Sequence, residues 1–202
     1  MTVDQKDSRR AGDRVTQLLD GRLGVVLPTT SRGVVRPFER TVGDEVQAVL
    51  DDAELTVDLT LRFLRLGGWS LGIGAGPLDE PLPASARAGS GEAFLRARAA
   101  VERAKSRSRP VPLAVVSGAP DGGRAAEAVL TLLGSVLTRR SQAGWAVVDT
   151  MGELGAGSTQ EDVAMRLGIT QQAVSQRLRA AMWAEEVAAR PVAARLLAEG
   201  DA

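Results

Sequence analysis

Apolar positions in residues 1–118 alternate between strand-like and helical spacing. This alternation predicts elements in the order β-α-β-β-α-β, followed by α-β. The first six match the ferredoxin-like pattern, in which an antiparallel sheet carries helices on one face. Strands are expected around Val3, ending near Asp4, and over 34–42, 46–50, 69–76 and 110–117. Helices are expected over 9–23, about 51–66 and 92–106, and a loop over 77–91.

After position 118 the apolar spacing is helical throughout. The cluster 119–123 (APDGG) is typical of a turn and marks the expected domain boundary. Helices are predicted over 124–137, 142–154, 182–189 and 191–197, with a helix pair between the second and third of these. The pattern therefore predicts an α+β protein. We expect a domain over 1–118, a connecting and dimerisation helix within 119–137, and an all-α domain over 138–202.

The segment 158–178 has the features of two short helices joined by a tight turn. Ser158 and Glu161 have the spacing of a capping box, which satisfies backbone N–H groups at a helix start. Gly168 can adopt the left-handed conformation that ends the first helix. Thr170 can cap the second helix. These features predict a helix-turn-helix, similar to that of MarR-type and sigma-factor-like regulators.

The second helix of this pair has an outer face made of amides, hydroxyls and arginines. Glutamine can bind adenine in a bidentate manner, and arginine binds guanine or phosphate. The first residues of such a helix enter the major groove of DNA. An ordinary helical hairpin in a bundle is the alternative interpretation. We expect contacts to double-stranded DNA from Thr170, Gln171, Gln172, Ser175, Gln176, Arg177, Arg179 and Arg166, the arginines chiefly on phosphates.

Composition removes several other classes of function. The chain of 202 residues has no Cys and no His. We therefore expect no zinc site, no haem and no catalytic triad that depends on histidine. The net charge of zero disfavours a dedicated nucleic-acid coat protein. No apolar run approaches the ~20 residues needed to cross a bilayer, and the N-terminus is polar, so a cytoplasmic protein without a membrane contact is expected.

Three short stretches carry a resemblance to a known family. Residues 40–48 (RTVGDEVQA) resemble the hairpin of nucleotidyl-cyclase and GGDEF domains, Asp4 with the following 7–8 (DS) resembles the end of their first strand, and 97–105 resembles a late helix whose Lys reaches phosphate. Over nearly its full length the chain looks most like the SatD-like family. This resemblance implies a metal held by Asp4 and Asp44, such as Mg²⁺ with a nucleotide.

The same resemblance implies nucleotide contacts from Asp44, Glu45, Arg98 and Lys105. The chain departs from active cyclases in having Val42 before a single glycine, and Phe94 where class III cyclases place an asparagine. A degenerate domain that binds a nucleotide without converting it fits these departures better. These charged residues could also be solvated ends of a hairpin and a surface helix.

Three hypotheses about function follow. The leading one is a homodimeric DNA-binding transcriptional regulator whose cyclase-like domain senses a nucleotide-type ligand or a partner. Dimerisation is expected because one short helix contacts too few base pairs for specificity. The second is an active metal-dependent nucleotidyl cyclase with a DNA-binding tail. The third is an adaptor without either activity.

Overall fold

The computed structural model describes residues 1–24, 27–155 and 157–201. It is an α+β protein with a five-stranded sheet in the order β2-β3-β1-β4-β5. Neighbouring strands are antiparallel, except that β5 runs parallel to β4. The expected strands are confirmed, with bounds β1 Thr2–Gln5, β2 Val34–Arg40, β3 Glu45–Leu50, β4 Trp69–Gly74 and β5 Leu113–Val116.

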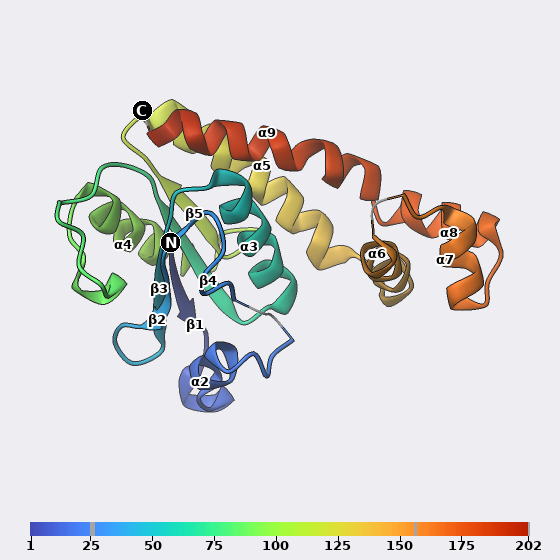
Figure 1. Cartoon of the computed structure of the whole chain (residues 1–202), viewed down its shortest axis with the longest axis horizontal. Helices are drawn as coiled ribbons and strands as arrows, with labels where there is room; N and C mark the ends of the chain where they lie inside the picture. Colours follow the sequence, from blue (N-terminus) through green and yellow to red (C-terminus); the bar gives the residue numbers. More distant parts are fainter. Residues whose placement is uncertain (25–26, 156, 202) are drawn as a thin grey trace.

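Helices fill most of the remaining described chain (Figure 1). The loop expected over 77–91 contains one turn of 3₁₀-helix, Ala86–Ala88. The helices are α1 Ser8–Ala11, α2 Arg14–Leu19, α3 Ala53–Leu66, α4 Glu92–Ala104, α5 Pro120–Arg139, α6 Gln142–Leu154, α7 Gln160–Leu167, α8 Gln171–Ala180 and α9 Trp183–Asp201.

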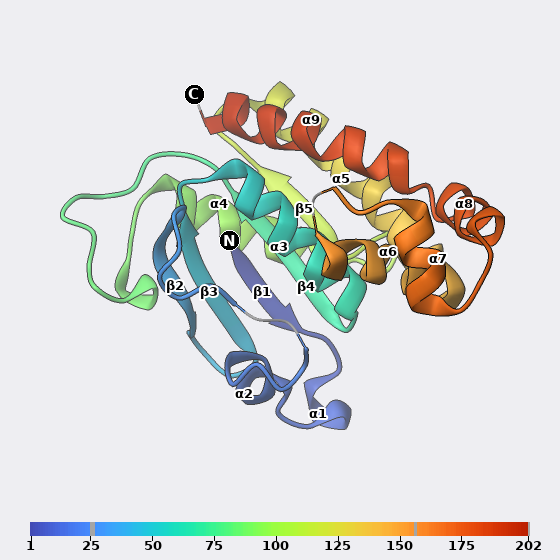
Figure 2. The same ribbon diagram turned by 45° about the vertical axis from the view of Figure 1, so that its right-hand side comes forward.

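The two faces of the sheet are covered by different helices, as Figure 1 and Figure 2 show. The core on one face joins the buried Val3, Val46 and Leu71 to residues of α2, α3, α5 and α9. On the other face α4 lies against β4 and β5. A Cβ at Gly74 would lie 2.2 Å from the backbone nitrogen of Ala97. The glycines of β4 therefore mark a close approach of α4 to the sheet.

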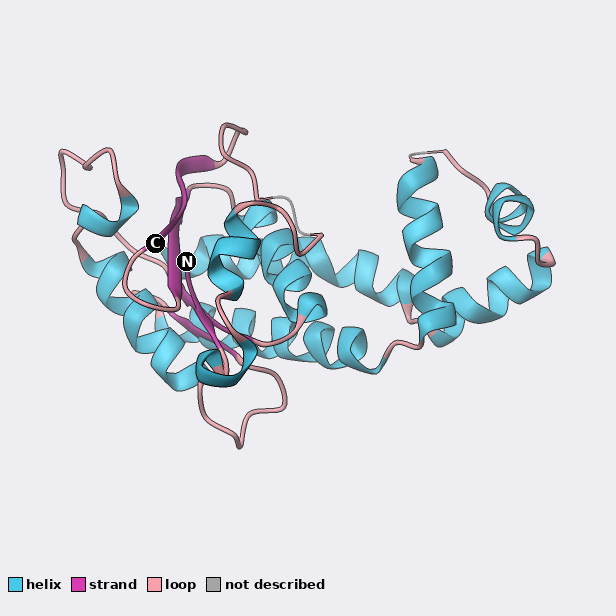
Figure 3. Cartoon of the chain, turned by 90° about the horizontal axis from the view of Figure 1, so that it is seen from below, coloured by secondary structure: helices cyan, strands magenta, loops and turns pink. Residues whose placement is uncertain are grey.

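A second, smaller core lies in the helices that follow α5. Val147, Val163, Val174 and Leu178 are buried together there. Figure 3 shows that α6, α7 and α8 lie far from the strands, on the side of the sheet opposite α4 and beyond the helices that cover that face. The chain therefore buries its apolar residues in a large core around the sheet and in a small helical core at one end.

Two expectations about local structure were wrong. The helix predicted over 9–23 is divided into α1 and α2, because Gly12 has a φ of 69° and the Asp13 side chain accepts a hydrogen bond from the N–H of Thr16. The turn predicted at 119–123 is instead the start of α5, with Ala119 at the N-cap and 120–123 in the helix. Pro120 stands at the first helical position, where its missing N–H would have had no partner in the helix.

The C-terminal helices also differ from expectation. The two helices predicted over 182–189 and 191–197 are one helix, α9, with Pro191 inside it. This helix packs on α5 and α3, and Ala193 and Leu197 are buried in the large core. Contacts on both sides of Pro191 sustain the helix although the proline removes one intrahelical hydrogen bond. The last part of the predicted 138–202 domain thus packs against elements of the sheet domain.

The helix predicted as a dimer interface, 124–137, lies within α5. Leu130, Leu133 and Leu137 are buried in the large core of the same chain, and Leu132 is 69% exposed. Most of the apolar face of α5 is therefore used within the chain. Dimerisation through this helix stays a prediction.

Candidate DNA-recognition helix and carboxylate cluster

The helix pair α7–α8 begins with a capping box, one residue later than predicted. The N–H of Thr159 donates to Asp162 Oδ2 at 2.8 Å, and the N–H of Asp162 donates to Thr159 Oγ1 at 3.2 Å. The predicted pair of Ser158 and Glu161 was therefore wrong. The helix begins at Gln160, which places Thr159 rather than Ser158 at the N-cap.

The turn between α7 and α8 has the predicted chemistry. Gly168 has a φ of 64° and a ψ of 37°, the left-handed conformation. The N–H of Ile169 then donates to the carbonyl of Ala164 at 3.0 Å. Thr170 caps α8, with its Oγ1 accepting a hydrogen bond from the N–H of Ala173 at 3.1 Å. Caps and turn thus hold the two helices in one arrangement.

The predicted DNA-contacting residues share one accessible surface. Thr170, Gln171, Gln172 and Gln176 are exposed, while Ser175 is half-buried. Val174 and Leu178, on the opposite side of α8, are buried against α6 and α7. The three glutamine amides are therefore accessible to a ligand surface, whereas Thr170 Oγ1 is engaged as the cap of α8.

Arginines flank this strip. Arg166 on α7 and Arg179 on α8 are exposed, and Arg177 is half-buried. In the part of the chain that the structure describes, no ion pair engages any of the three. Their charges can therefore attract phosphates without first breaking an internal ion pair.

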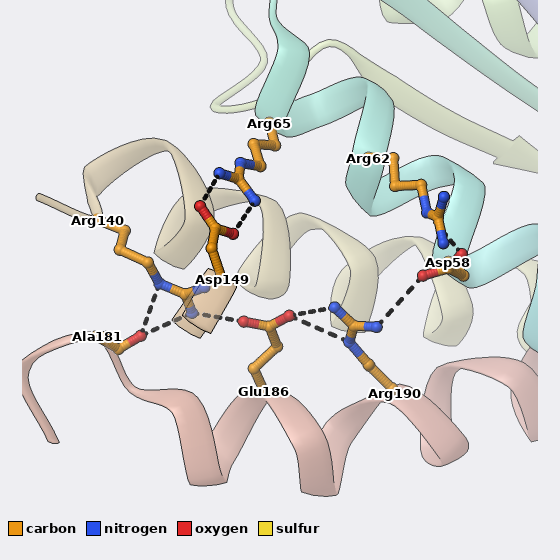
Figure 4. A network of polar contacts seen from close by, with 8 residues as sticks. All are labelled: Asp58, Arg62, Arg65, Arg140, Asp149, Ala181, Glu186 and Arg190. Carbon is orange, nitrogen blue, oxygen red and sulfur yellow. Dashed lines mark hydrogen bonds and ion pairs between the residues drawn. The ribbon is translucent and has the colours of Figure 1, made fainter. Parts of the chain in front are cut away.

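A buried ion pair fixes the far end of α8, and sequence analysis did not find it (Figure 4). Arg140 follows α5, and its side chain is 0% exposed. Its guanidinium donates to the carbonyl of Ala181, at the end of α8, at 2.8 and 3.1 Å, and to Glu186 Oε2 at 2.5 Å. Because Glu186 lies 46 residues further along the chain, no local pattern pairs the two.

Three further contacts connect this region to α3. Arg65 forms two hydrogen bonds of 2.6 Å to Asp149 of α6 (Figure 4). The Trp145 ring lies near two guanidinium groups, with Arg65 at 3.7 Å and Arg140 at 4.4 Å from its centre. Arg190 of α9 reaches Glu186 and also Asp58 of α3, the latter at 3.5 Å. We call Asp58, Arg65, Arg140, Trp145, Asp149, Glu186 and Arg190 the interdomain network.

The predicted nucleotide site lies at the other end of β1 from the chain's first residue. Asp4 and Glu45 are register partners on β1 and β3. Lys105, just after α4, lies 3.2 Å from Asp4 Oδ2. Arg98 lies 3.4 Å from Glu45 Oε1, and Asp44 occupies the hairpin turn, where its carbonyl accepts from the N–H of Gln5. The fold thus brings together the strand end, hairpin and helix that the resemblance singled out.

Titration of Asp4 reflects its position between the sheet and α4. Burial raises the pKa of Asp4, the Lys105 ammonium opposes this rise, and the charges of Asp44 and Glu45 add to it. Burial disfavours the charged form of Lys105, but the carboxylates of Glu102 and Asp4 outweigh it and raise the pKa of this lysine. At neutral pH the geometry is that of a carboxylate–ammonium pair.

These residues do not form a ready magnesium site. Across 1–24, 27–155 and 157–201, no three carboxylates come together in a group that could hold a metal ion. The Asp4 carboxylate pairs with Lys105, and Glu45 accepts hydrogen bonds from Thr41 and Arg98. A Mg²⁺ ion at Asp4 and Asp44 would have to displace Lys105 from the Asp4 carboxylate, so the metal stays a prediction.

Comparisons with known proteins add no assignment. Neither family models, nor curated proteins, nor solved structures give a match to the chain. In the described residues, none of the helices combines the length and the apolar character required to cross a membrane. The interpretation of both sites therefore depends on their geometry and chemistry.

Proposed function

We propose that the protein is a DNA-binding transcriptional regulator in which α8 enters the major groove of an operator. The observation that supports this most is the exposed strip on α8, which presents Gln171, Gln172 and Ser175 from a helix capped at its start and anchored at its end. Amides and hydroxyls on a rigid helix suit the reading of base edges. Arg166 on α7 and the two arginines of α8, Arg177 and Arg179, would bind the phosphates.

The proposal includes a homodimer and a cytoplasmic location with no membrane contact. Paired recognition helices would provide the specificity that one helix of ten residues lacks. The chain's zero net charge means that its affinity would depend on a local arginine cluster rather than on the whole molecule.

For the N-terminal part we propose a ferredoxin-like, nucleotidyl-cyclase-like domain over 1–118, related to the SatD-like family. The order β2-β3-β1-β4 with antiparallel neighbours supports this assignment. The domain would bind a nucleotide-type ligand near Asp44 and Glu45, with Lys105 and Arg98 on its phosphates. We do not extend the proposal to catalysis, because Lys105 pairs with the Asp4 carboxylate that a metal would need.

The DNA proposal is tested by selecting duplexes from a random library with the full chain, then measuring affinity for the selected sequence against salt. We expect a linear fall of log affinity with log salt concentration, with a slope set by the phosphates contacted. Gln172→Ala should relax base preference by roughly 1–3 kcal/mol at one position. Gln142→Ala, at an exposed glutamine of α6, is the matched control and should leave base preference unchanged. A chain that selects no sequence and ignores duplexes at low salt would refute the proposal.

The nucleotide proposal is tested by calorimetric titration with ATP and GTP, with and without Mg²⁺. Binding should weaken in Lys105→Gln and stay unchanged in Arg107→Gln, an exposed cation just beyond it. Pyrophosphate release in the same mixtures would favour the cyclase alternative instead. Absence of binding to either nucleotide would remove this part of the proposal and leave the DNA part standing.

A further inference from the structure

A cavity of about 340 Å³ lies at the opposite end of β1 and β3 from Asp4 and Glu45. It opens where β3 and β4 end, at Leu50 and Gly74. Its walls include the first turns of α3 and α4 and the last turns of α9, which Figure 1 shows converging above the sheet. This volume falls in the range of pockets that hold small organic ligands, roughly 300–1,000 Å³.

The lining of the cavity is mostly apolar and includes two carboxylates. Ile73, Phe94 and Leu197 contribute apolar wall, and Asp51 and Asp52 contribute carboxylates. No lysine or arginine stands among the described lining residues. Met1 also contributes to the lining, but its amino group donates to the Ala48 carbonyl at 2.9 Å, and burial lowers the pKa of this group to about 5.

The two aspartates differ in what they already bind. Asp52 caps α3, with its Oδ1 accepting from the N–H of Leu55 at 3.0 Å. Asp51 is exposed, and its carboxylate makes no hydrogen bond or ion pair with another described residue. The helix start of α3 would favour an anion, but the Asp52 carboxylate already caps it, and at the start of α4 the Glu92 carboxylate pairs with Arg96, whose guanidinium also donates to the Ala75 carbonyl. A cation is therefore the better complement.

We propose that this cavity binds a small lipophilic amine, with its hydrocarbon body against Ile73, Phe94 and Leu197 and its ammonium group at Asp51. An ammonium gains a charge-assisted hydrogen bond to the carboxylate. An anionic ligand, including a nucleotide, would meet two carboxylates and no lysine or arginine among the described lining residues. This site is distinct from the proposed nucleotide site, which lies at the other end of β1.

The cavity is also placed to influence α8, an inference that rests on the proposed DNA-binding function. Two of its walls continue into the interdomain network: α3 carries Asp58 and Arg65, and α9 carries Glu186 and Arg190. A ligand that favours one position of α3 against α9 would thereby favour one position of α8.

The site is tested by calorimetry on the full chain with three probes of similar size: 2-phenylethylamine, 2-phenylethanol and 3-phenylpropanoate. We expect the amine to bind most tightly and the acid least. Asp51→Asn should weaken the amine about tenfold, as expected for loss of a charged hydrogen-bond partner, and leave the alcohol unchanged. Glu54→Gln removes one exposed carboxylate outside the cavity and is the matched control.

Three results would overturn the amine site: binding of the acid as tight as that of the amine, unchanged amine affinity in Asp51→Asn, or no binding of any probe. For the coupling, the amine should change the affinity of the chain for its selected duplex at fixed salt, and Asp51→Asn should abolish the change. An amine that binds without altering DNA affinity would refute the coupling. A chain that binds the amine but no DNA would refute the proposed function and leave the cavity assignment in place.

Discussion

The buried pair of Arg140 and Glu186 gives the sharpest quantitative prediction. Their side chains are 0% and 1% exposed, and Glu186 is also the partner of the half-buried Arg190. Replacing Glu186 with alanine leaves the Arg140 charge buried, with the Ala181 carbonyl as its remaining acceptor among the described residues. One guanidinium nitrogen of Arg140, Nη1, already has no hydrogen-bond partner there.

Removing one member of such a pair costs about 3–5 kcal/mol, because the other charge stays out of water without compensation. With a urea dependence of about 2 kcal/mol per molar for a small protein, the midpoint of unfolding should fall by about 1.5–2.5 M. The tryptophans provide the signal, because Trp145 lies beside Arg140. Glu185→Ala, which removes the exposed neighbour, is the matched control and should shift the midpoint little.

A double variant separates lost charge compensation from lost packing. Arg140→Met with Glu186→Leu replaces both charges by apolar side chains of similar size, and such replacements are often neutral or stabilising. The double variant should therefore unfold at higher urea than Glu186→Ala alone. A fall of less than about 0.5 M for Glu186→Ala, or a double variant less stable than the single one, would refute this reasoning.

Three further predictions concern single positions. Gly168→Val should destabilise the α7–α8 region by about 1–3 kcal/mol in chemical unfolding, because a β-branched residue resists the φ of 64° at this turn. Gly74→Ala should cost about 1–3 kcal/mol of stability, because its Cβ would lie 2.2 Å from the Ala97 nitrogen and α4 would have to move. An unchanged urea midpoint would contradict this packing. Burial raises the pKa of Asp4 from 3.8, so the stability that this group contributes is fully present below pH 3.8 and is lost as the pH rises through the raised value. The free energy of unfolding of Asp4→Asn minus that of the parent should therefore be larger at pH 7 than at pH 3. An equal difference at the two pH values would contradict this.

Periodicity predicted much of the fold because the relevant physics is local. The strand over Glu45–Leu50 and the helix over Gln142–Leu154 follow from alternation and helical spacing, which report the side of an element that is buried. The cap at Thr170 was also predicted, since it depends on a side chain and a backbone N–H three residues apart.

Other features depended on packing that no local pattern reports. The capping box was predicted at Ser158 but lies at Thr159, and its position depends on where α7 begins against α6 and α8. Pro191 was expected to start a helix, but packing of α9 on α5 and α3 keeps the helix continuous through it. Tertiary contacts outweigh local preference in such cases.

The sequence alone determined the α+β class, the helix-turn-helix pattern and the polar character of the outer face of α8, because each depends on residues close together along the chain. Only the tertiary structure decided that Asp4 pairs with Lys105, that Arg140 pairs with Glu186, and that α9 returns to the sheet domain. These contacts join residues separated by 46 positions or more, or by whole elements, and their energies depend on burial. The pattern of residues along the chain does not indicate which distant charges are buried together.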